Sequence, residues 1–207
     1  MKFLCSTLLV LCLCLIGVNA SAQKLYVWAP EAATPTRRPL FESIDTVDIV
    51  VFDGRNILEK SKVEYSSEEL VEHITKEIQS VYDGATFDVL PKTKYYKAPA
   101  ENHVTIKVGI AAYQAGFGAN IDVAIGSVGG NFSYGIFPKG KWNGVTSFFV
   151  RVYDRRNGLY VTQEKEIVSQ IDKSNTGGYT TAKKCLKESY SEASSKMYFF
   201  IDSVFMQ

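Results

Sequence analysis

The chain has 207 residues, of which 46% are hydrophobic and 22% are charged, and its formal net charge at pH 7 is +1. This length and this hydrophobic content are sufficient for one domain with a sizeable core. A charge balance near zero provides no electrostatic basis for binding a polyanion, so we expect no nucleic-acid partner.

Residues 1–22 have the pattern of a secretory signal peptide. Lys2 supplies a positive charge, residues 3–18 form an apolar run, and Ala20-Ser21-Ala22 satisfies the small-residue rule for cleavage. The apolar run is shorter than the ~20 residues of a membrane-spanning helix. Cys12 and Cys14 follow leucines rather than the small residue that lipid attachment requires, which leaves lipidation open. We expect an exported protein, in the periplasm or associated with the outer membrane, and the signal resembles those of Bacteroidetes.

Cleavage leaves Cys185 as the single cysteine of the mature chain, so no intramolecular disulfide is possible. Cys185 lies beside Leu186 on the apolar side of a predicted helix, where cysteine packs as a small hydrophobic residue. This position favours a structural thiol over a nucleophile activated by His73 or His103. One cysteine and two distant histidines have no metal-ligand spacing, so we expect no metal and no cofactor.

The first half of the mature chain predicts an extended leader, two strands and a helix. Residues 23–44 contain three prolines, which exclude a helix. The β-branched run 46–53 predicts a buried strand, and 85–91 predicts a short one. Ser66 and Glu69 form a capping box before an apolar helical stripe. The stripe consists of Leu70, Ile74, Ile78 and Val81, and Gly84 follows it as a stop signal.

The second half predicts a strand over 103–113, a hairpin and a long helix. Two β-rich runs flank Asn157-Gly158, which is a strong hairpin signal. Apolar residues at helical spacing over 180–206 predict a helix packed on the sheet. We therefore expect a single α/β (α+β) domain over 45–207, with a mixed sheet of about five strands flanked by two helices.

Residues 113–145 predict an inserted glycine-rich β-hairpin, because apolar residues alternate with small or polar ones on both arms. Gly116-Phe117-Gly118 lacks the third glycine and the following helix of a dinucleotide loop. Between Lys107 and Lys139 the only charged residue is Asp122, whereas an exposed hairpin normally carries protective charges. The hairpin therefore needs an apolar cover, which its own domain, a protein partner or the outer membrane could provide.

We expect the apolar and aromatic side chains of this hairpin to form the contact surface, since aromatic anchors dominate interface energetics. The expected partner is an envelope protein or a second copy of the chain. The expected contact residues are Phe117, Ile121, Val123, Phe132, Tyr134, Phe137 and Trp142.

The order of motifs resembles a family of bacterial envelope proteins. The motifs follow each other over 47–204. They begin with a strand at "DTVDIVVFDGRN" and a capped helix, and continue with a strand at "HVTIKVGIAAYQAG" and a glycine-rich stretch. Arg151-Val152-Tyr153-Asp154 with Gly158 comes next, and a helix closes the order. This order is similar to that of lipoproteins related to the curli-secretion channel subunit (CsgG-like) and to activators of penicillin-binding proteins. The channel subunits insert two hairpins into the membrane, whereas here only 114–137 is suitable, because 161–170 is charged. The resemblance implies an accessory module rather than a pore.

The sequence thus favours a non-enzymatic accessory or assembly protein of the cell envelope. One alternative is a glycan- or ligand-binding periplasmic module that uses Tyr95, Tyr96 and Trp142 as stacking platforms. A second alternative is an envelope hydrolase, which needs two carboxylates that converge in a cleft. Its candidate carboxylates are Asp122, Asp154 and Asp172.

Overall fold

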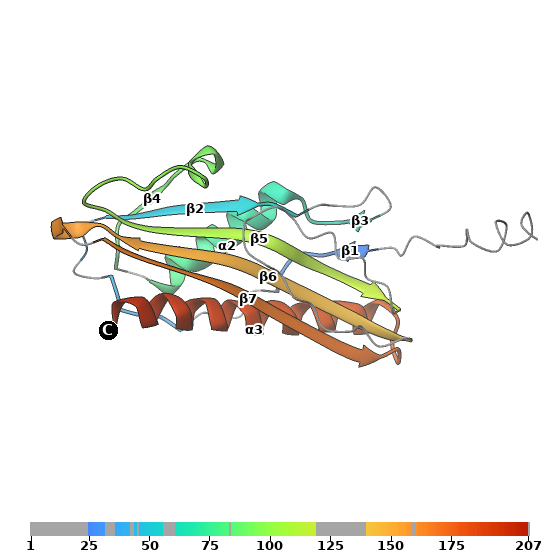
Figure 1. Cartoon of the computed structure of the whole chain (residues 1–207). Helices are drawn as coiled ribbons and strands as arrows, with labels where there is room; N and C mark the ends of the chain where they lie inside the picture. Colours follow the sequence, from blue (N-terminus) through green and yellow to red (C-terminus); the bar gives the residue numbers. More distant parts are fainter. Residues whose placement is uncertain are drawn as a thin grey trace, which may run out of the picture.

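The computed structural model describes residues 25–31, 36–41, 44, 46–55, 61–82, 84–118, 140–158 and 160–206. These residues form a seven-stranded mixed sheet with two helices packed on it, and Figure 1 shows α3 running along the strands of the sheet. The predicted α+β fold class is confirmed. The elements are β1 (Leu25–Val27), β2 (Val47–Asp53), β3 (Lys62–Val63), α2 (Ser67–Val81), β4 (Phe87–Val89), β5 (Val104–Phe117), β6 (Lys141–Asp154), β7 (Val161–Ser174) and α3 (Tyr179–Phe205).

The central strand β5 has different neighbours at its two ends. Along one edge it pairs antiparallel with β6 over its whole length. Along the other edge, residues 104–110 pair parallel with β2, and 115–116 pair antiparallel with β1. An irregularity in the register lies between Ile110 and Ala112, where β2 ends. Because a bulge bends a strand and increases its twist, it lets one long strand serve two parts of the sheet.

Helix α2 begins where its capping box predicts. The Glu69 backbone N–H donates to Ser66 Oγ at 3.1 Å, and the Ser66 backbone N–H donates to a Glu69 carboxylate oxygen at 2.7 Å. The predicted stripe is buried and faces the sheet, with contacts to β2. The predicted helix and its apolar face are confirmed.

Helix α3 packs so closely on β6 that only glycine fits at one position. A Cβ atom at Gly144 would lie 2.4 Å from the backbone carbon of Cys185. Next along the contact, the hydroxyls of Thr146 and Ser189 are 2.9 Å apart and share a buried hydrogen bond. Cys185 is completely buried, and its Sγ donates to the Trp142 carbonyl at 3.6 Å. The prediction that this cysteine packs as a core residue is confirmed.

The loop after β4 is tied to the opposite face of the sheet. A small apolar cluster there contains Val50, Tyr95, Ala111 and Phe149. The buried ammonium of Lys107 donates to the carbonyls of Lys94 at 3.0 Å and Tyr95 at 3.2 Å, and it also contacts the Lys97 carbonyl. Burial lowers the pKa of Lys107. This lysine fixes a loop whose backbone carbonyls would otherwise have fewer partners.

The hairpin predicted at Asn157-Gly158 is confirmed as the connection between β6 and β7. Both turn residues have positive φ, 52° at Asn157 and 76° at Gly158. Asparagine and glycine adopt this left-handed conformation at the lowest cost, which explains why this dipeptide makes the turn. Strand β7 pairs with β6 alone among the described strands, and its charged outer residues protect that edge.

The leader contributes to the sheet. Strand β1 pairs with both β5 and β3, and Leu25, Val27 and Phe41 are buried in the structure. The backbone N–H of Arg38 donates to the Val81 carbonyl at 2.7 Å, and the guanidinium of Arg38 forms an ion pair with Asp202. Parts of the described leader are therefore packed on the domain.

Candidate docking surface at the end of the β5–β6 ladder

The structure locates the root of the predicted insert. Residues 113–117 belong to β5 and 141–145 belong to β6, and the Gly118 backbone N–H donates to the Lys141 carbonyl at 3.1 Å. Both ends of the predicted insert are thus part of the sheet, and its middle, 119–139, connects the two strands. Of the predicted contact residues, Phe117 and Trp142 are described, and Ile121, Val123, Phe132, Tyr134 and Phe137 lie outside the described residues.

Phe117 and Trp142 belong to a group of five aromatic side chains, which we call the aromatic cluster: Tyr26, Trp28, Phe117, Trp142 and Tyr179. Phe117 and Trp142 are register partners with ring centroids 5.2 Å apart. Trp142 also packs on Tyr26 at 5.8 Å and on Tyr179 at 5.9 Å. Tyr26 stacks on Trp28 at 5.5 Å with nearly parallel rings. Strands β1, β5 and β6 and the start of α3 thus meet at one place.

The cluster has a buried base and two exposed rings. Trp142 is 6% exposed, and Tyr26 and Trp28 are buried as well. Phe117 is 40% exposed and Tyr179 is 58% exposed. Trp142 therefore supports the surface from below in this structure, whereas Phe117 and Tyr179 are accessible to a partner.

Hydrogen bonds hold the buried rings in place. The Trp142 indole N–H donates to Asn175 Oδ1 at 3.1 Å, and the same oxygen accepts from the Gly178 backbone N–H at 3.0 Å. The hydroxyls of Tyr26 and Tyr179 are 3.2 Å apart. This hydrogen bond, together with burial, raises the pKa of Tyr26. Aromatic rings fixed in this way lose little conformational entropy on binding, which favours a docking surface.

Sequence reasoning missed Tyr26, Trp28 and Tyr179 as members of this surface. Tyr26 and Trp28 are two residues apart, which places them on one face of a strand. This spacing is the sequence signal that could have indicated a shared aromatic surface. Their meeting with Tyr179 depends on the pairing of β1 with β5, which joins segments far apart in the sequence.

A charged cavity of about 260 Å³ lies beside the aromatic cluster. Its wall includes Trp28, and the Lys183 ammonium lies 5.4 Å from the Trp28 ring, within the range of a cation–π interaction. Lys187 and Glu31, at the same cavity, form an ion pair. Apolar rings bordered by paired charges have the composition of an interface core with a polar rim.

Three buried polar side chains near the root of the insert each have one polar atom without a hydrogen-bond partner. These atoms are Gln114 Nε2, Asn143 Oδ1 and Ser147 Oγ. The three residues share the face of the β5–β6 ladder opposite α3, because the alternating residues Gly144 and Thr146 face that helix. Unpaired buried polar groups destabilise a fold, so this face is not arranged for stability alone.

The carboxylates considered for hydrolysis are engaged with basic side chains. Asp154 binds the guanidinium of Arg156 with bonds of 2.9 and 2.7 Å, which lower the pKa of Asp154. Asp172 forms an ion pair with Lys141 at 2.7 Å. Asp154 and Asp172 lie at opposite ends of the β6–β7 ladder, and Asp122 lies outside the described residues. The described residues therefore provide no convergent carboxylate pair from this set.

Of the residues considered for glycan stacking, Tyr95 and Tyr96 are in contact, with ring centroids 4.9 Å apart, and Trp142 belongs to a different cluster. Tyr95 is completely buried under Phe52, with ring centroids 5.0 Å apart, and Trp142 is buried in the aromatic cluster. Tyr96 is exposed, but it belongs to the loop after β4 rather than to the aromatic cluster. These three rings do not form one stacking platform.

The histidines and the cysteine are not assembled into a catalytic group. His103 Nδ1 lies 3.0 Å from Asp48, and His73 Nε2 lies 3.5 Å from Glu77. In the described part of the chain, no three metal-binding side chains are grouped closely enough to hold a metal ion. A search of the described residues likewise finds no helix with the length and apolar character to cross a membrane.

Comparison with known proteins gives similarity in structure only. No family model matches the chain, and no curated protein matches it. The hypothetical protein CT253 from Chlamydia trachomatis shares 13% identity over 78% of this chain and 97% of its own, with a TM-score of 0.45. Lipoprotein GNA1162 from Neisseria meningitidis shares 10% identity over 74% of this chain and 98% of its own (TM-score 0.33). Rare lipoprotein B from Shewanella oneidensis shares 6% identity over 76% of this chain and 98% of its own (TM-score 0.33).

The solved structures similar to this chain thus include bacterial lipoproteins. The finer resemblance to curli-secretion subunits and to activators of penicillin-binding proteins stays a prediction. With identities of 13% or lower and TM-scores below 0.5, these similarities transfer no function. The function must be inferred from the residues of this chain.

Proposed function

We propose that the protein is a non-enzymatic accessory or assembly protein of the bacterial cell envelope, and that it docks on another envelope protein through residues 113–145. The observation that carries this proposal is the aromatic cluster at the root of the insert. Its buried base fixes Phe117 and Tyr179 at the surface, next to the point where the chain enters 119–139.

The composition of the insert supports the same proposal. It joins two paired strands, yet between Lys107 and Lys139 Asp122 is the only charged residue. Exposed strands without charges associate with other chains, and apolar residues beside a fixed aromatic group extend the area that a partner can bury. The proposed contact residues in the insert are Ile121, Val123, Phe132, Tyr134 and Phe137.

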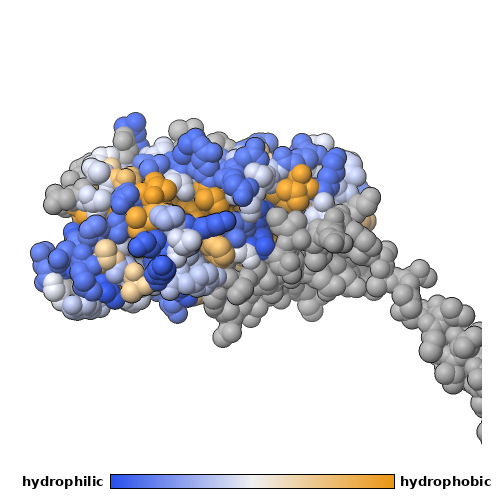
Figure 2. Space-filling view, turned by 90° about the horizontal axis from the view of Figure 1, so that it is seen from above, coloured by the Kyte–Doolittle hydropathy of each residue, from blue (hydrophilic) through white to orange (hydrophobic). Residues whose placement is uncertain are grey.

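Apolar residues are also exposed elsewhere on the described surface. Figure 2 shows the molecule from above, where apolar patches lie among hydrophilic side chains. Other large exposed apolar residues include Val89 in β4, and Phe199 and Met206 at the end of α3. Single exposed apolar residues are ordinary on soluble surfaces, whereas a supported aromatic group is not.

The proposed location is the periplasm or the outer membrane. The signal features of residues 1–22 support export, because they combine a positive start, an apolar run and small residues at a cleavage position.

Site-specific photo-crosslinking in the native envelope tests the proposal. A photoreactive phenylalanine analogue replaces Phe117 in one variant and Phe132 in a second. We expect both to give the same discrete crosslinked protein. The matched control is Phe199, which is 70% exposed on α3 and outside the proposed surface.

The crosslinks also separate the possible covers of the insert. A product of twice the mass of the chain assigns the partner to a second copy. Crosslinking to lipid alone, or equal yields of one product at all three positions, contradicts docking on a partner protein through this surface.

A further inference from the structure

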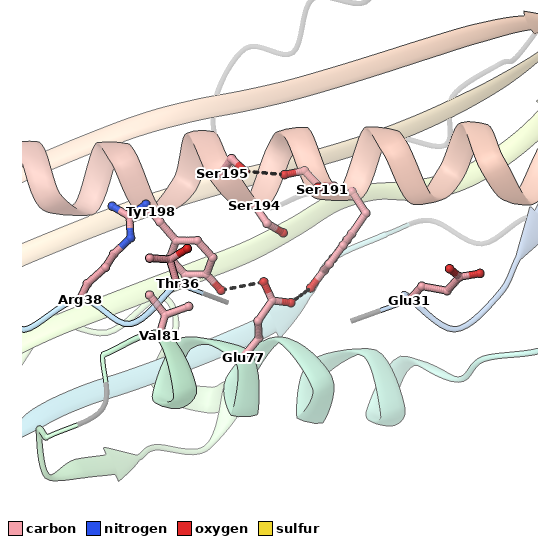
Figure 3. A pocket seen from close by; sticks show the side chains of 10 residues that line it. Glu31, Thr36, Arg38, Glu77, Val81, Ser191, Ser194, Ser195 and Tyr198 are labelled. Atoms are coloured by element: carbon pink, nitrogen blue, oxygen red, sulfur yellow. Dashed lines mark hydrogen bonds between the residues drawn. The ribbon is translucent and has the colours of Figure 1, made fainter. Parts of the chain in front are cut away.

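A second cavity, of about 250 Å³, lies between α2, α3 and the N-terminal segment. Figure 3 shows its side chains, with Glu77 and Val81 from α2 facing the serine and tyrosine residues of α3. It is lined by different residues from those of the aromatic cluster. The lining residues are Glu31, Thr36, Arg38, Glu77, Val81, Tyr190, Ser191, Ser194, Ser195 and Tyr198.

The carboxylate of Glu77 is the central polar group of this cavity. It accepts hydrogen bonds from the hydroxyl of Tyr190 at 2.6 Å and from the hydroxyl of Tyr198 at 2.9 Å, one on each oxygen. Burial, together with the negative charge of Glu77, raises the pKa values of both tyrosines well above normal, so they remain donors. Because each carboxylate oxygen can accept about two hydrogen bonds, Glu77 is oriented and retains acceptor capacity.

Ser194 adds a buried hydroxyl beside Tyr190. The residue is 5% exposed, its hydroxyl interacts with the side chain of Tyr190, and its Oγ forms no hydrogen bond of ordinary geometry with the described residues. Figure 3 shows this side chain directed from α3 toward the space above Glu77. A buried hydroxyl without a well-formed hydrogen bond costs stability, and a ligand that supplies a better partner offsets that cost.

The charges around the cavity favour a cation. Its charged lining residues are Glu31, Arg38 and Glu77. Arg38 forms an ion pair with Asp202, and Glu31 forms one with Lys187, so among the described residues Glu77 is the lining carboxylate that no lysine or arginine neutralises. His73 lies 3.5 Å from Glu77 and brings positive charge only when it is protonated. The Glu77 carboxylate thus provides the acceptors, and the lining hydroxyls provide both donors and acceptors.

We propose that this cavity binds a small molecule that carries a protonated primary amine and hydroxyl groups. The ammonium donates to Glu77, and a hydroxyl of the ligand pairs with Ser194. An ammonium with three donors suits a carboxylate with free acceptor capacity, and hydrogen bonds between charged groups are the stronger ones. A metal ion suits the site less well, because the described residues hold no group of three metal-binding side chains. This proposal does not depend on docking through the insert.

A matched pair of probes tests the requirement for an ammonium group. D-Glucamine is an open-chain aminohexitol, and D-glucitol has a hydroxyl in place of its amine. We expect calorimetric titration at neutral pH to show saturable binding of glucamine that is at least about tenfold tighter than that of glucitol. Equal affinities, or no saturable binding of glucamine, overturn the proposal.

Two substitutions in α2 test whether Glu77 binds the ammonium group. Glu77→Gln keeps the size of the side chain and removes its charge, and we expect the affinity for glucamine to fall at least about tenfold. Glu72→Gln is the matched control, since Glu72 is an exposed residue of α2 that pairs with Lys76 outside the cavity. Unchanged affinity in Glu77→Gln overturns the proposal, as does an equal loss in Glu72→Gln.

Ser194→Ala keeps the proposal testable if Glu77→Gln does not fold. Because the Ser194 hydroxyl forms no hydrogen bond of ordinary geometry in the described structure, its removal should change the melting temperature little. We expect the same variant to bind glucamine about threefold to tenfold more weakly. Unchanged affinity in Ser194→Ala overturns the role of this hydroxyl and with it the proposed site.

Discussion

At the scale of single residues, several buried polar side chains have structural partners. Asp53, at the end of β2, binds the guanidinium of Arg55 with bonds as short as 2.6 Å, and both side chains are almost completely buried. Arg55 also donates to the Tyr113 carbonyl at 3.2 Å, which ties the end of β2 to β5. Cys185 is enclosed between α3 and β6. These groups hold elements together.

The burial of the Cys185 thiol predicts how its rate of alkylation depends on pH. Burial raises its pKa to about 11. Since only the thiolate reacts, the rate of alkylation should increase about tenfold per pH unit from neutral pH up to this pKa. At mildly alkaline pH we expect iodoacetamide to modify the native protein at least about a hundredfold more slowly than the urea-unfolded protein, as measured by mass spectrometry. A native rate close to the unfolded rate would show that the thiol is accessible.

At the scale of elements, the contact between α3 and β6 limits which residues the strand can contain. The backbone of Cys185 approaches Gly144 so closely that a side chain has no space. The contact continues through the hydrogen bond between Thr146 and Ser189 and through Phe148, which packs on Tyr190. The helix is thus held along the same half of β6 that carries the root of the insert.

We expect Gly144→Ala to lower the free energy of unfolding by about 2–4 kcal/mol, because the methyl group forces the helix away from the strand. Urea unfolding followed by circular dichroism measures this change. Gly177→Ala is the control, since the nearest contact of a methyl group there is the Thr181 hydroxyl at 3.3 Å. We expect it to change stability by less than about 1 kcal/mol. Equal effects of the two substitutions would contradict the close approach.

At the scale of the whole molecule, the long β5–β6 ladder belongs to the core of the sheet and leads at one end into residues 119–139. One end of β5 is held by β2 and the other by β1, while β6 accompanies it throughout. Residues 115–117 therefore stabilise the sheet although they were predicted to belong to the insert. The segment that can be removed without loss of the described strand pairs is 119–139.

A pair of deletions tests this division. Replacing 119–139 by an Asn-Gly turn should leave a cooperatively folded domain with a nearly unchanged melting temperature, because the described ladder is kept. Deleting 115–138 should lower the melting temperature by about 5–10 °C more, since it removes the pairs of β5 with β1 and the ring of Phe117. Thermal unfolding monitored by near-ultraviolet circular dichroism compares them. Loss of cooperative folding in the first variant would make 119–139 part of the core and remove the basis for docking.

Much of this architecture could be predicted from the sequence, because the signals are local. The capping box at Ser66, the stripe of α2, the spacing in α3 and the Asn157-Gly158 turn each specify their own geometry within a few residues. The strands β1 and β3 could not be predicted, because three and two residues are too few to show a period. Their stability comes from pairing with distant strands rather than from their own pattern.

The sequence by itself determined the order of the main elements, the burial of Cys185 and the scarcity of charge between Lys107 and Lys139. The tertiary structure alone decided that Trp142 lies buried beneath Phe117 and Tyr179, and that Glu77 meets two tyrosines and Ser194 across a cavity. The physical reason is the distance along the chain over which each interaction acts. Caps, turns and periodic stripes act between neighbours along the chain, whereas a surface or a cavity depends on contacts between segments that only strand pairing and helix packing bring together.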